Sequence, residues 1–437
     1  MSKLSALVLI PVLLAAGCGG GGGSSTSGNG NGNGNGGGGN TLACTAEAVS
    51  LAEQLQNPVS LFTTNSNKGA KADNNGVILE LPPIASGGAT DPKGAVLVFG
   101  IGTESNNGIP ASGVTKIDGD PATGNVSATL NGKAYPNGYF DSGSNANFFT
   151  DSAVPACSSP DQAFYCPNTA SVTENATMAG TNTGPIPAEF SLENAITLFD
   201  GNPSATAFND LGGPNSDSKA LDLGLPFFYG QNIYTGFESP TNATPYFAFE
   251  AVSSPGTNTQ PPIAAAGPPN VEPITIDSGP SGLSPPAVNT PFISVTICVP
   301  GTSDCQTIDH VEVDTGSVGL RLIASVVTLA LPAEKDASNN PLAECLQFAD
   351  GTSWGSVVTA DISLPTSGEA AKGVNVQLIG ASAAGSPPSA CTGTAENSVD
   401  SFGANGIIGV GPFSNDCNIS GDCAPGSQSA NYYYCTG

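Results

Sequence analysis

The chain has 437 residues, which is room for two domains or for one large domain with two lobes. Only 11% of the residues are charged, and 10 Lys and Arg against 36 Asp and Glu give a formal net charge of −26. This balance argues against nucleic acid as a partner, because nucleic-acid recognition needs Lys and Arg to neutralise phosphates. Gly (57) and Pro (36) are abundant and the aliphatic runs are short, so the composition predicts a mainly β protein.

The first residues resemble the export signal of a bacterial lipoprotein. Lys3 supplies a positive charge, and residues 4–16 form an apolar segment that is too short to span a membrane. Small residues stand directly before Cys18, as in a lipoprotein cleavage box. We therefore expect residues 1–17 to be a signal peptide and residues 18–43 to be a lipidated Cys with a flexible Gly/Asn/Ser tether. This predicts a membrane-anchored lipoprotein of the bacterial cell envelope, at the outer membrane and facing the periplasm or the surface.

The part of the chain before residue 239 predicts two short helices among strands. Residues 45–57 have a helical apolar stripe, with Thr45 able to cap its start and Pro58 able to end it. Residues 191–199 form a second candidate helix with Ser191 as its N-cap. The expected strands cover residues 58–62, 76–81 and 95–101, and residues 221–229 are expected to pair with residues 232–237.

The middle of the chain predicts an interdomain linker. Pro, Ala, Ser, Thr and Asn dominate residues 239–270 without clear periodicity. Strands are expected again further on, at residues 271–276, 291–299, 374–379 and 403–411.

Two matched segments carry an Asp directly after an apolar strand. Residues 138–148 contain Asp141 followed by Ser and Gly, and residues 310–320 contain Asp314 followed by Thr and Gly. One such triplet is usually an Asx-type turn. In each segment a further Ser follows the triplet, and an apolar residue follows a few positions on. Two matched copies therefore suggest a pair of carboxylates that act together.

Two other features of these segments are interpreted as structural. A third triplet begins at Asp277, but Pro280 follows it and it lies only 37 residues before Asp314 (314 − 277), so we interpret it as a turn. His310 is the single His of the chain, which leaves little scope for a Ser-His or Cys-His site. We expect His310 itself to be a surface residue at a strand end.

Ten cysteines remain beside Cys18, an even number for an exported chain, so five disulfides are plausible. Spacing does not fix their connectivity. Pairing of near neighbours suggests Cys157–Cys166, Cys298–Cys305 and Cys417–Cys423, and leaves Cys345–Cys391 and Cys44–Cys435. A single His and the lack of a Cys-x-x-Cys pair make a zinc site improbable, and we expect no metal and no cofactor.

Residues 44–437 resemble a pepsin-type aspartic protease over most of their length. Besides the two Asp segments, the stretch from Phe348 through Asp350 and Gly351 resembles the flap hairpin that folds over the substrate in that family. Residues 405–411 resemble the apolar-apolar-Gly strand that runs behind the first catalytic loop of the family. Three further stretches resemble strands of its second lobe: residues 94–102, 221–229 and 233–237. At closer range, the chain resembles a family of uncharacterised bacterial lipoproteins that is known only as a domain of unknown function.

The order of the two Asp segments is reversed relative to the pepsin family, in which the Asp-Thr-Gly lobe comes first. The resemblance therefore implies a bilobal, pepsin-like fold with its lobe order swapped by circular permutation. The implied units are a helix and strand of the Asp314 lobe at residues 44–66, an Asp141 lobe of second-lobe type at 67–238, the linker at 239–270, and an Asp314 lobe of first-lobe type at 271–437. A Cys44–Cys435 disulfide would staple the new chain ends.

The resemblance implies an aspartic endopeptidase. Asp314 and Asp141 would form the catalytic dyad without a metal or cofactor, within loops completed by Gly316 and Gly143. Thr315 and Ser142 would hydrogen-bond across the lobe interface, and Ser317 and Ser144 would each support one carboxylate. The expected partner is a peptide or protein substrate or ligand, with membrane contact through the lipid anchor and the protein a monomer.

Two departures from the pepsin pattern fall in the expected flap. Phe348 stands where the family usually has Tyr, and Arg321 stands where it usually has Trp. An Arg321–Phe348 cation–π contact could replace the lost brace. Trp354 is either a wall of the cleft or a core residue at the flap base. These departures leave open an alternative function, a non-catalytic pepsin-like envelope lipoprotein that acts in binding.

Overall fold

The computed structural model describes residues 43–63, 72–238, 244–253, 264–265, 267, 269–348, 351–416 and 431–436. Over these residues the protein is mainly β, as its composition predicts. The expected signal peptide, Cys18 with its tether, Asp350 and the Cys417–Cys423 pair lie outside the described residues. No helix in the described part is long and apolar enough to cross a membrane.

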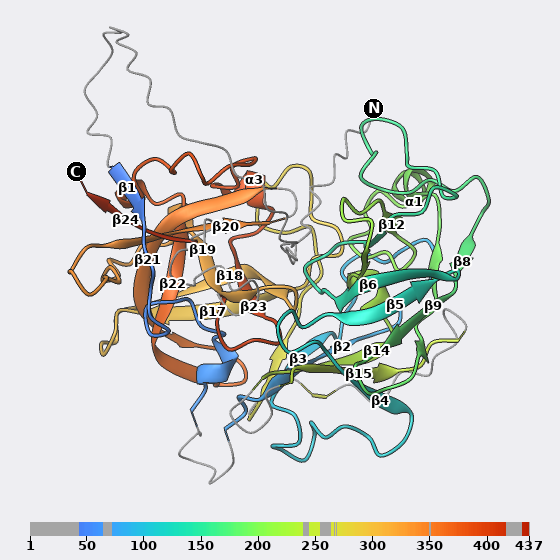
Figure 1. Ribbon diagram of the computed structural model, residues 1–437, viewed down its shortest axis with the longest axis horizontal. Coiled ribbons are helices and arrows are strands. Elements are labelled where there is room, and N and C mark those ends of the chain that lie inside the picture. The colour runs from blue at the N-terminus through green and yellow to red at the C-terminus, as the bar shows by residue number, and fades with distance from the viewer. Residues whose placement is uncertain are drawn as a thin grey trace, which may run out of the picture.

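A nine-stranded sheet, here called the Asp314 half, contains the strand that leads to Asp314. Its strand order is β1-β24-β20-β21-β17-β18-β23-β19-β22. The strands are β1 (Ala43–Ala46), β17 (Phe292–Cys298), β18 (Cys305–Asp314), β19 (Val318–Ile323), β20 (Leu342–Gln347), β21 (Thr352–Ser363), β22 (Ala370–Ile379), β23 (Gly406–Val410) and β24 (Tyr432–Thr436). The first and last strands pair antiparallel, so both ends of the described chain lie at one edge of this sheet (Figure 1).

Three further sheets form the Asp141 half. Their orders are β10-β9-β5-β6-β13-β7-β12, β16-β3-β2-β14-β15-β4 and β11-β8. The strands are β2 (Gly76–Leu81), β3 (Val96–Phe99), β4 (Val114–Asp118), β5 (Val126–Leu130), β6 (Lys133–Phe140), β7 (Asn147–Phe149), β8 (Val172–Glu174), β9 (Ala176–Ala179), β10 (Ile186–Pro187), β11 (Phe190–Leu192), β12 (Gly212–Gly213), β13 (Ala220–Leu223), β14 (Gln231–Gly236), β15 (Tyr246–Glu250) and β16 (Val271–Pro273).

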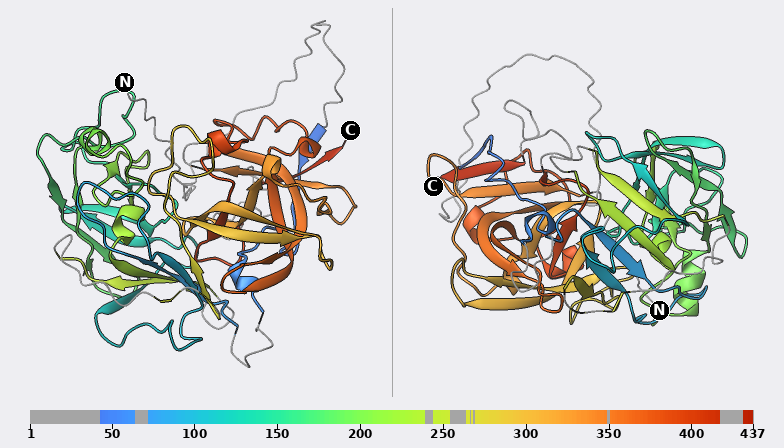
Figure 2. Two further views of the ribbon diagram at one scale, coloured as in Figure 1. Left: turned by 180° about the vertical axis from the view of Figure 1, so that it is seen from behind. Right: turned by 90° about the horizontal axis from the view of Figure 1, so that it is seen from below.

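Helices in the described part are short. The α-helices are α1 (Ala195–Gly201), α2 (Leu225–Phe228) and α3 (Val399–Phe402), and the 3₁₀ helices are η1 (Val59–Leu61), η2 (Ala324–Val326) and η3 (Ser382–Ala384). The two halves lie side by side in all three views, with the orange strands on one side and the green and teal strands on the other (Figures 1 and 2).

The strands that lead to the two Asp residues are anchored in the hydrophobic core. One cluster of buried apolar side chains extends through both halves and includes Phe140 and Val313, the residues directly before the two Asp residues. The ring of Phe140 lies 5.0 Å from the rings of both Phe247 and Phe249. Because interior packing tolerates little movement, the core fixes the ends of β6 and β18.

The helix expected at residues 45–57 does not form. Residues 43–46 are strand β1, paired with β24 and tied to it by the Cys44–Cys435 disulfide, and turns follow. A lone helix of this length is marginal in water, so the ladder and the disulfide decide the conformation. Leu51 is 61% exposed, whereas Leu55 is buried. The strand expected at 58–62 is also wrong: Pro58 leads into the 3₁₀ helix η1, with a backbone already in the helical region.

The second expected helix begins later than its pattern suggests. Ser191 lies in β11 and its hydroxyl donates to Asp210, so it does not cap a helix. The N-cap of α1 is Asn194, whose side chain accepts a hydrogen bond from the Thr197 backbone N–H. Ser and Asn both favour N-cap positions. Because β11 pairs with β8, Ser191 belongs to a strand, and Asn194 is the residue that caps the helix.

The pairing expected between residues 221–229 and 232–237 is wrong. β13 pairs with β6 and β7, and residues 225–228 form helix α2, which has Pro226 in its first turn. β14 pairs with β2 and β15 instead. Pro suits the first turn of a helix because its missing N–H would have no intrahelical partner there.

The expected linker at 239–270 contains strand β15, which pairs with β14 and β4 inside the Asp141 half. Phe247, Ala248 and Phe249 are all buried, so the short apolar run outweighs the surrounding loop composition. β16, at the start of the stretch assigned to the Asp314 lobe, pairs with β3 of the Asp141 half. The change from one half to the other therefore falls between β16 and β17.

Candidate functional site

The two Asp residues stand at the ends of equivalent strands. Asp141 directly follows β6, and β13 runs parallel to β6 and antiparallel to β7. Asp314 ends β18, and β23 runs parallel to β18 and antiparallel to β19. The same three-strand arrangement thus surrounds each Asp, and its registers make positions of the two halves comparable.

Hydrogen bonds cross between the two Asp loops through Ser142 and Thr315. The Ser142 hydroxyl donates to the Val313 carbonyl at 2.7 Å, and the Thr315 hydroxyl donates to the Phe140 carbonyl at 3.0 Å. The Ser142 N–H donates to Thr315 Oγ1 at 2.9 Å, and the Thr315 N–H donates to Ser142 Oγ at 3.1 Å. All four bonds are buried, so each loop fixes the other.

The glycines of the loops make room for the opposite carboxylate. The Gly143 N–H donates to Asp141 Oδ1 at 2.9 Å, and the Gly316 N–H donates to Asp314 Oδ1 at 2.7 Å. A Cβ atom on Gly143 would lie 2.8 Å from Asp314 Oδ1, and one on Gly316 would lie 2.5 Å from Asp141 Oδ2. A side chain at either position would displace the facing carboxylate.

Asp141 and Asp314 are both fully buried and are hydrogen-bonded to each other through their side chains. Burial, followed by the charge of Asp314, raises the pKa of Asp141 well above its usual range. Burial also raises the pKa of Asp314, but its hydrogen bonds to Asp141 and to the Gly316 N–H and the charge of Arg321 oppose that rise. Burial thus favours the protonated form of both groups, and the interactions that oppose it act mainly on Asp314.

Ser144 joins Asp141 to a third carboxylate that the sequence analysis missed. Its Oγ lies 3.2 Å from Asp141 Oδ2 and 2.6 Å from Asp222 Oδ2. Asp222 lies on β13 and is fully buried. The one available signal was an Asp within the apolar stretch from Leu221 to Leu223.

The chain matches the model of a family described as "Protein of unknown function (DUF3443)" over residues 37–249 and 266–437, which is most of its length. The chain belongs to this family. A comparison with curated proteins gives no match.

In this DUF3443 protein Arg321 does not contact Phe348, contrary to the expected cation–π pair. Arg321 is fully buried, and its guanidinium donates to Glu344 Oε1 at 2.6 Å and lies 3.4 Å from Asp416 Oδ2. Burial opposes the charge of Arg321, but Glu344 and Asp416 outweigh it and raise its pKa above the usual value. The Tyr432 hydroxyl donates to Asp416 at 2.7 Å and accepts the Leu55 N–H at 2.7 Å. The guanidinium of Arg321 therefore binds two carboxyl groups, those of Glu344 and Asp416, instead of an aromatic ring.

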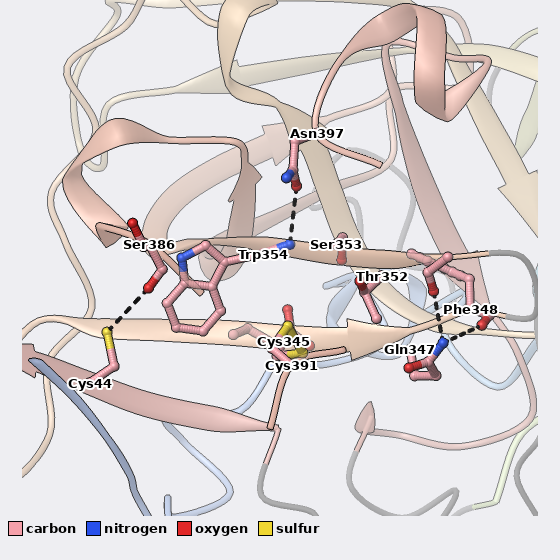
Figure 3. Close-up of a disulfide and its surroundings, with 12 residues drawn as sticks. Cys44, Cys345, Gln347, Phe348, Thr352, Ser353, Trp354, Ser386, Cys391 and Asn397 are labelled. Carbon is pink, nitrogen blue, oxygen red and sulfur yellow. Dashed lines mark hydrogen bonds between the residues drawn. A yellow bond between two sulfur atoms is a disulfide. The ribbon is translucent and has the colours of Figure 1, made fainter. Parts of the chain in front are cut away.

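The expected flap corresponds to the hairpin of β20 and β21 (Figure 3). Phe348 is buried against Phe402, with ring centroids 5.8 Å apart, and its N–H donates to the Gly351 carbonyl at 2.8 Å. Gln347 Nε2 donates to the carbonyls of Phe348 and Gly351 at 3.0 and 3.1 Å. Phe348 thus belongs to an apolar cluster that contains Phe292, Ile323 and Ile379.

Of the two positions expected for Trp354, the structure shows the buried one at the base of the hairpin. It is 4% exposed, packs edge-on against Tyr433, and donates through Nε1 to the Gly385 carbonyl at 3.1 Å. The neighbouring Cys345–Cys391 disulfide lies in the same hairpin region (Figure 3). Trp354 therefore supports the hairpin base.

His310 lies inside β18 rather than at its end, and is partly buried. Its Nε2 is 3.3 Å from Asp277 Oδ1 and its Nδ1 is 3.3 Å from Asp309 Oδ2. Asp277 accepts the Gly279 N–H at 2.9 Å, as expected of an Asx turn. The third triplet thus forms the expected turn, and its Asp277 contacts His310 of β18.

Four of the five expected disulfides are present: Cys44–Cys435, Cys157–Cys166, Cys298–Cys305 and Cys345–Cys391. Within the described residues, no group of His, Cys, Asp and Glu side chains has the arrangement of a metal site.

Proposed function

We propose that this protein is an aspartic endopeptidase in which Asp141 and Asp314 activate a water molecule to hydrolyse peptide bonds. The observation that carries the proposal is the buried, hydrogen-bonded pair of carboxylates held by two matched, mutually bonded loops. A shared proton gives such a pair one acid and one base at the same pH.

In the first step Asp314, which carries the charge, would accept a proton from water while Asp141 donates its proton to the carbonyl oxygen of the peptide. The water oxygen would bond to the carbonyl carbon, giving a neutral tetrahedral diol. In the second step the proton now on Asp314 would pass to the amide nitrogen, the C–N bond would break, and one diol hydroxyl would return a proton to Asp141. The dyad would then be back in its starting state.

We further propose that the fold is pepsin-like and circularly permuted. Two halves, each with one Asp loop inside the same three-strand arrangement, support this. The Asp-Ser-Gly half comes before the Asp-Thr-Gly half, the reverse of the pepsin order. The first and last described strands, β1 and β24, pair with each other and are joined by the Cys44–Cys435 disulfide. This is the arrangement expected if a circular permutation created the present chain ends by cutting a surface loop.

The protein would act at the cell envelope, held by a lipid on Cys18, as a monomer. Its substrate would be a peptide or protein on the same side of the membrane. The export signal and the tether composition support this location.

One observation favours a second function, a non-catalytic binding protein. Phe348 lacks the hydroxyl of the usual flap Tyr and is buried against Phe402, so the hairpin has one group fewer for orienting a substrate. A peptide could then bind between the halves without being cut.

Cleavage of a denatured protein by the purified protein, measured over roughly pH 3 to 7, tests the proposal. A parallel series should contain a peptide analogue with a hydroxyl in place of the cleaved carbonyl, because such analogues bind dyads more tightly than substrates do. We expect cleavage with an acidic optimum and its loss with the analogue. Tight binding of the analogue without any cleavage would favour the binding protein.

A further inference from the structure

The Ser144 hydroxyl lies between two fully buried carboxyl groups, and one of these is paired with a third. Ser144 Oγ contacts Asp222 at 2.6 Å and Asp141 at 3.2 Å, and Asp141 is hydrogen-bonded to Asp314. A hydroxyl carries one proton and can donate to only one of its two carboxyl neighbours. For both contacts to be hydrogen bonds, Asp222 or Asp141 must donate to Ser144, so this group holds a proton beyond the hydroxyl's own.

The surroundings of Asp222 favour the neutral acid. Asp222 Oδ1 has no hydrogen-bond partner in the described structure, and a buried carboxylate without partners is costly. The titratable groups that act on it are Asp141 and Asp314 from the two loops and Tyr139 from the neighbouring strand β6. All three are acidic, so none of them offsets a negative charge on Asp222. Burial and the charge of Asp314 raise the pKa of Asp222 well above its usual range, against the hydrogen bond from Ser144.

The other half shows that the strand arrangement does not require an acid here. Asp222 pairs with Tyr139, two residues before Asp141, and Ile407 pairs with Glu312, two residues before Asp314. Ile407 is therefore the structural equivalent of Asp222, and it is a buried apolar residue. An acid at one of two equivalent buried positions points to a role in the Asp141 loop.

We propose that Asp222 is a positioning residue that stays protonated, donates to Ser144, and so directs the Ser144 hydroxyl at Asp141. This deepens and rests on the proposed function. When Asp141 gives its proton to the substrate, the Ser144 hydroxyl is then aimed at the new carboxylate. If Asp222 loses its own proton at higher pH, Ser144 turns toward Asp222, and Asp141 loses this donor and gains a negative neighbour. Asp222 would thereby set the alkaline limit of activity.

Asp222→Asn tests the proposal, since an amide can donate to Ser144 at every pH. We expect kcat at the optimum to stay within about tenfold of wild type and the alkaline limb to move up by about one pH unit or more. Asp222→Ile, which places the equivalent residue of the other half here, should lower kcat more than KM because Ser144 loses its orientation. A lowered rate with an unchanged alkaline limb in Asp222→Asn would mean a merely structural role and would overturn the proposal.

A measurement without substrate separates this inference from the protease function. The infrared carbonyl band of protonated carboxyl groups near neutral pH should lose intensity in Asp222→Asn relative to wild type. Asp222→Ile should lose the same intensity, so either variant suffices if the other does not fold. Loss of the band without any cleavage by wild type would uphold the protonated Asp222 and sink the protease function. Cleavage by wild type with an unchanged band would overturn the inference alone.

Discussion

Arg321→Met should show how much the buried charge cluster contributes to stability. Arg321, Glu344 and Asp416 are all buried, and Arg321 also donates to the Val318 carbonyl at 2.6 Å. Removing the single cation leaves two close carboxyl groups without a counter-charge. Loss of one partner of a buried pair typically costs about 3–5 kcal/mol in the free energy of unfolding. We expect a loss in this range near neutral pH.

The loss should shrink in acid. Burial and the charge of Glu344 already raise the pKa of Asp416 well above its usual value, while Arg321 opposes the rise. The folded state therefore keeps a proton that the unfolded chain releases, so stability falls as pH rises above the unfolded pKa of about 4. Without Arg321 this pKa rises further and the slope steepens. Below about pH 4 both states are protonated and the difference between variant and wild type should be smallest.

Urea unfolding followed by Trp354 fluorescence measures this, because Trp354 is the single Trp of the chain and is buried. Circular dichroism should give a coincident transition. Lys93→Met is the matched control: its salt bridge to Asp91 is exposed at the surface, with 78% of the Lys side chain accessible, and should be worth about 1 kcal/mol or less. An Arg321→Met loss as small as the control's, or one that is equal at neutral and acid pH, would refute the reasoning.

Further predictions concern the loops, the chain ends and acid stability. Ser142→Ala should lower the free energy of unfolding by about 1–3 kcal/mol and reduce cleavage, since the buried Val313 carbonyl loses its hydrogen-bond donor. Thr315→Ser keeps the hydroxyl and should change neither quantity. Equal losses in the two variants would contradict this account. Replacing Cys44 and Cys435 together with Ser should cost about 2–4 kcal/mol in urea unfolding, and no change would mean that the pairing of β1 with β24 suffices. Because burial raises the pKa of Asp141 and of other acids, wild type should unfold at a lower urea concentration near pH 8 than near pH 5, and the reverse order would contradict those shifts.

The Asp loops are predictable from sequence because their information is local. An apolar strand, an Asp, a hydroxyl residue and a Gly stand next to one another in both copies, and each copy forms the same turn. Cysteine spacing is equally direct for the Cys157–Cys166 and Cys298–Cys305 pairs.

What the sequence does not reveal depends on residues that are distant along the chain. Arg321 meets Asp416 across 95 positions, and Ser144 meets Asp222 across 78. No local pattern specifies such partners, so the sequence alone predicts an aromatic contact for Arg321 and an ordinary strand around Asp222. The predictions for residues 45–57 and for the segment around β15 are wrong for a related reason. In both places pairing within a sheet outweighs the local preference, which is helical in the first segment and loop-like in the second.

Cleavage by Asp141→Asn and Asp314→Asn, compared with wild type, tests the central claim most directly. Each Asn is nearly isosteric with Asp, so Trp354 fluorescence should show an intact fold, while the shared proton and the base are lost. Asp277→Asn is the control, because Asn can also form the Asx turn at that site and Asp277 lies outside the dyad. We expect wild type and the control to cleave and both dyad variants to be inactive. Cleavage that survives in either dyad variant, or an inactive wild type that is correctly folded, would contradict the assignment of Asp141 and Asp314 as a catalytic dyad.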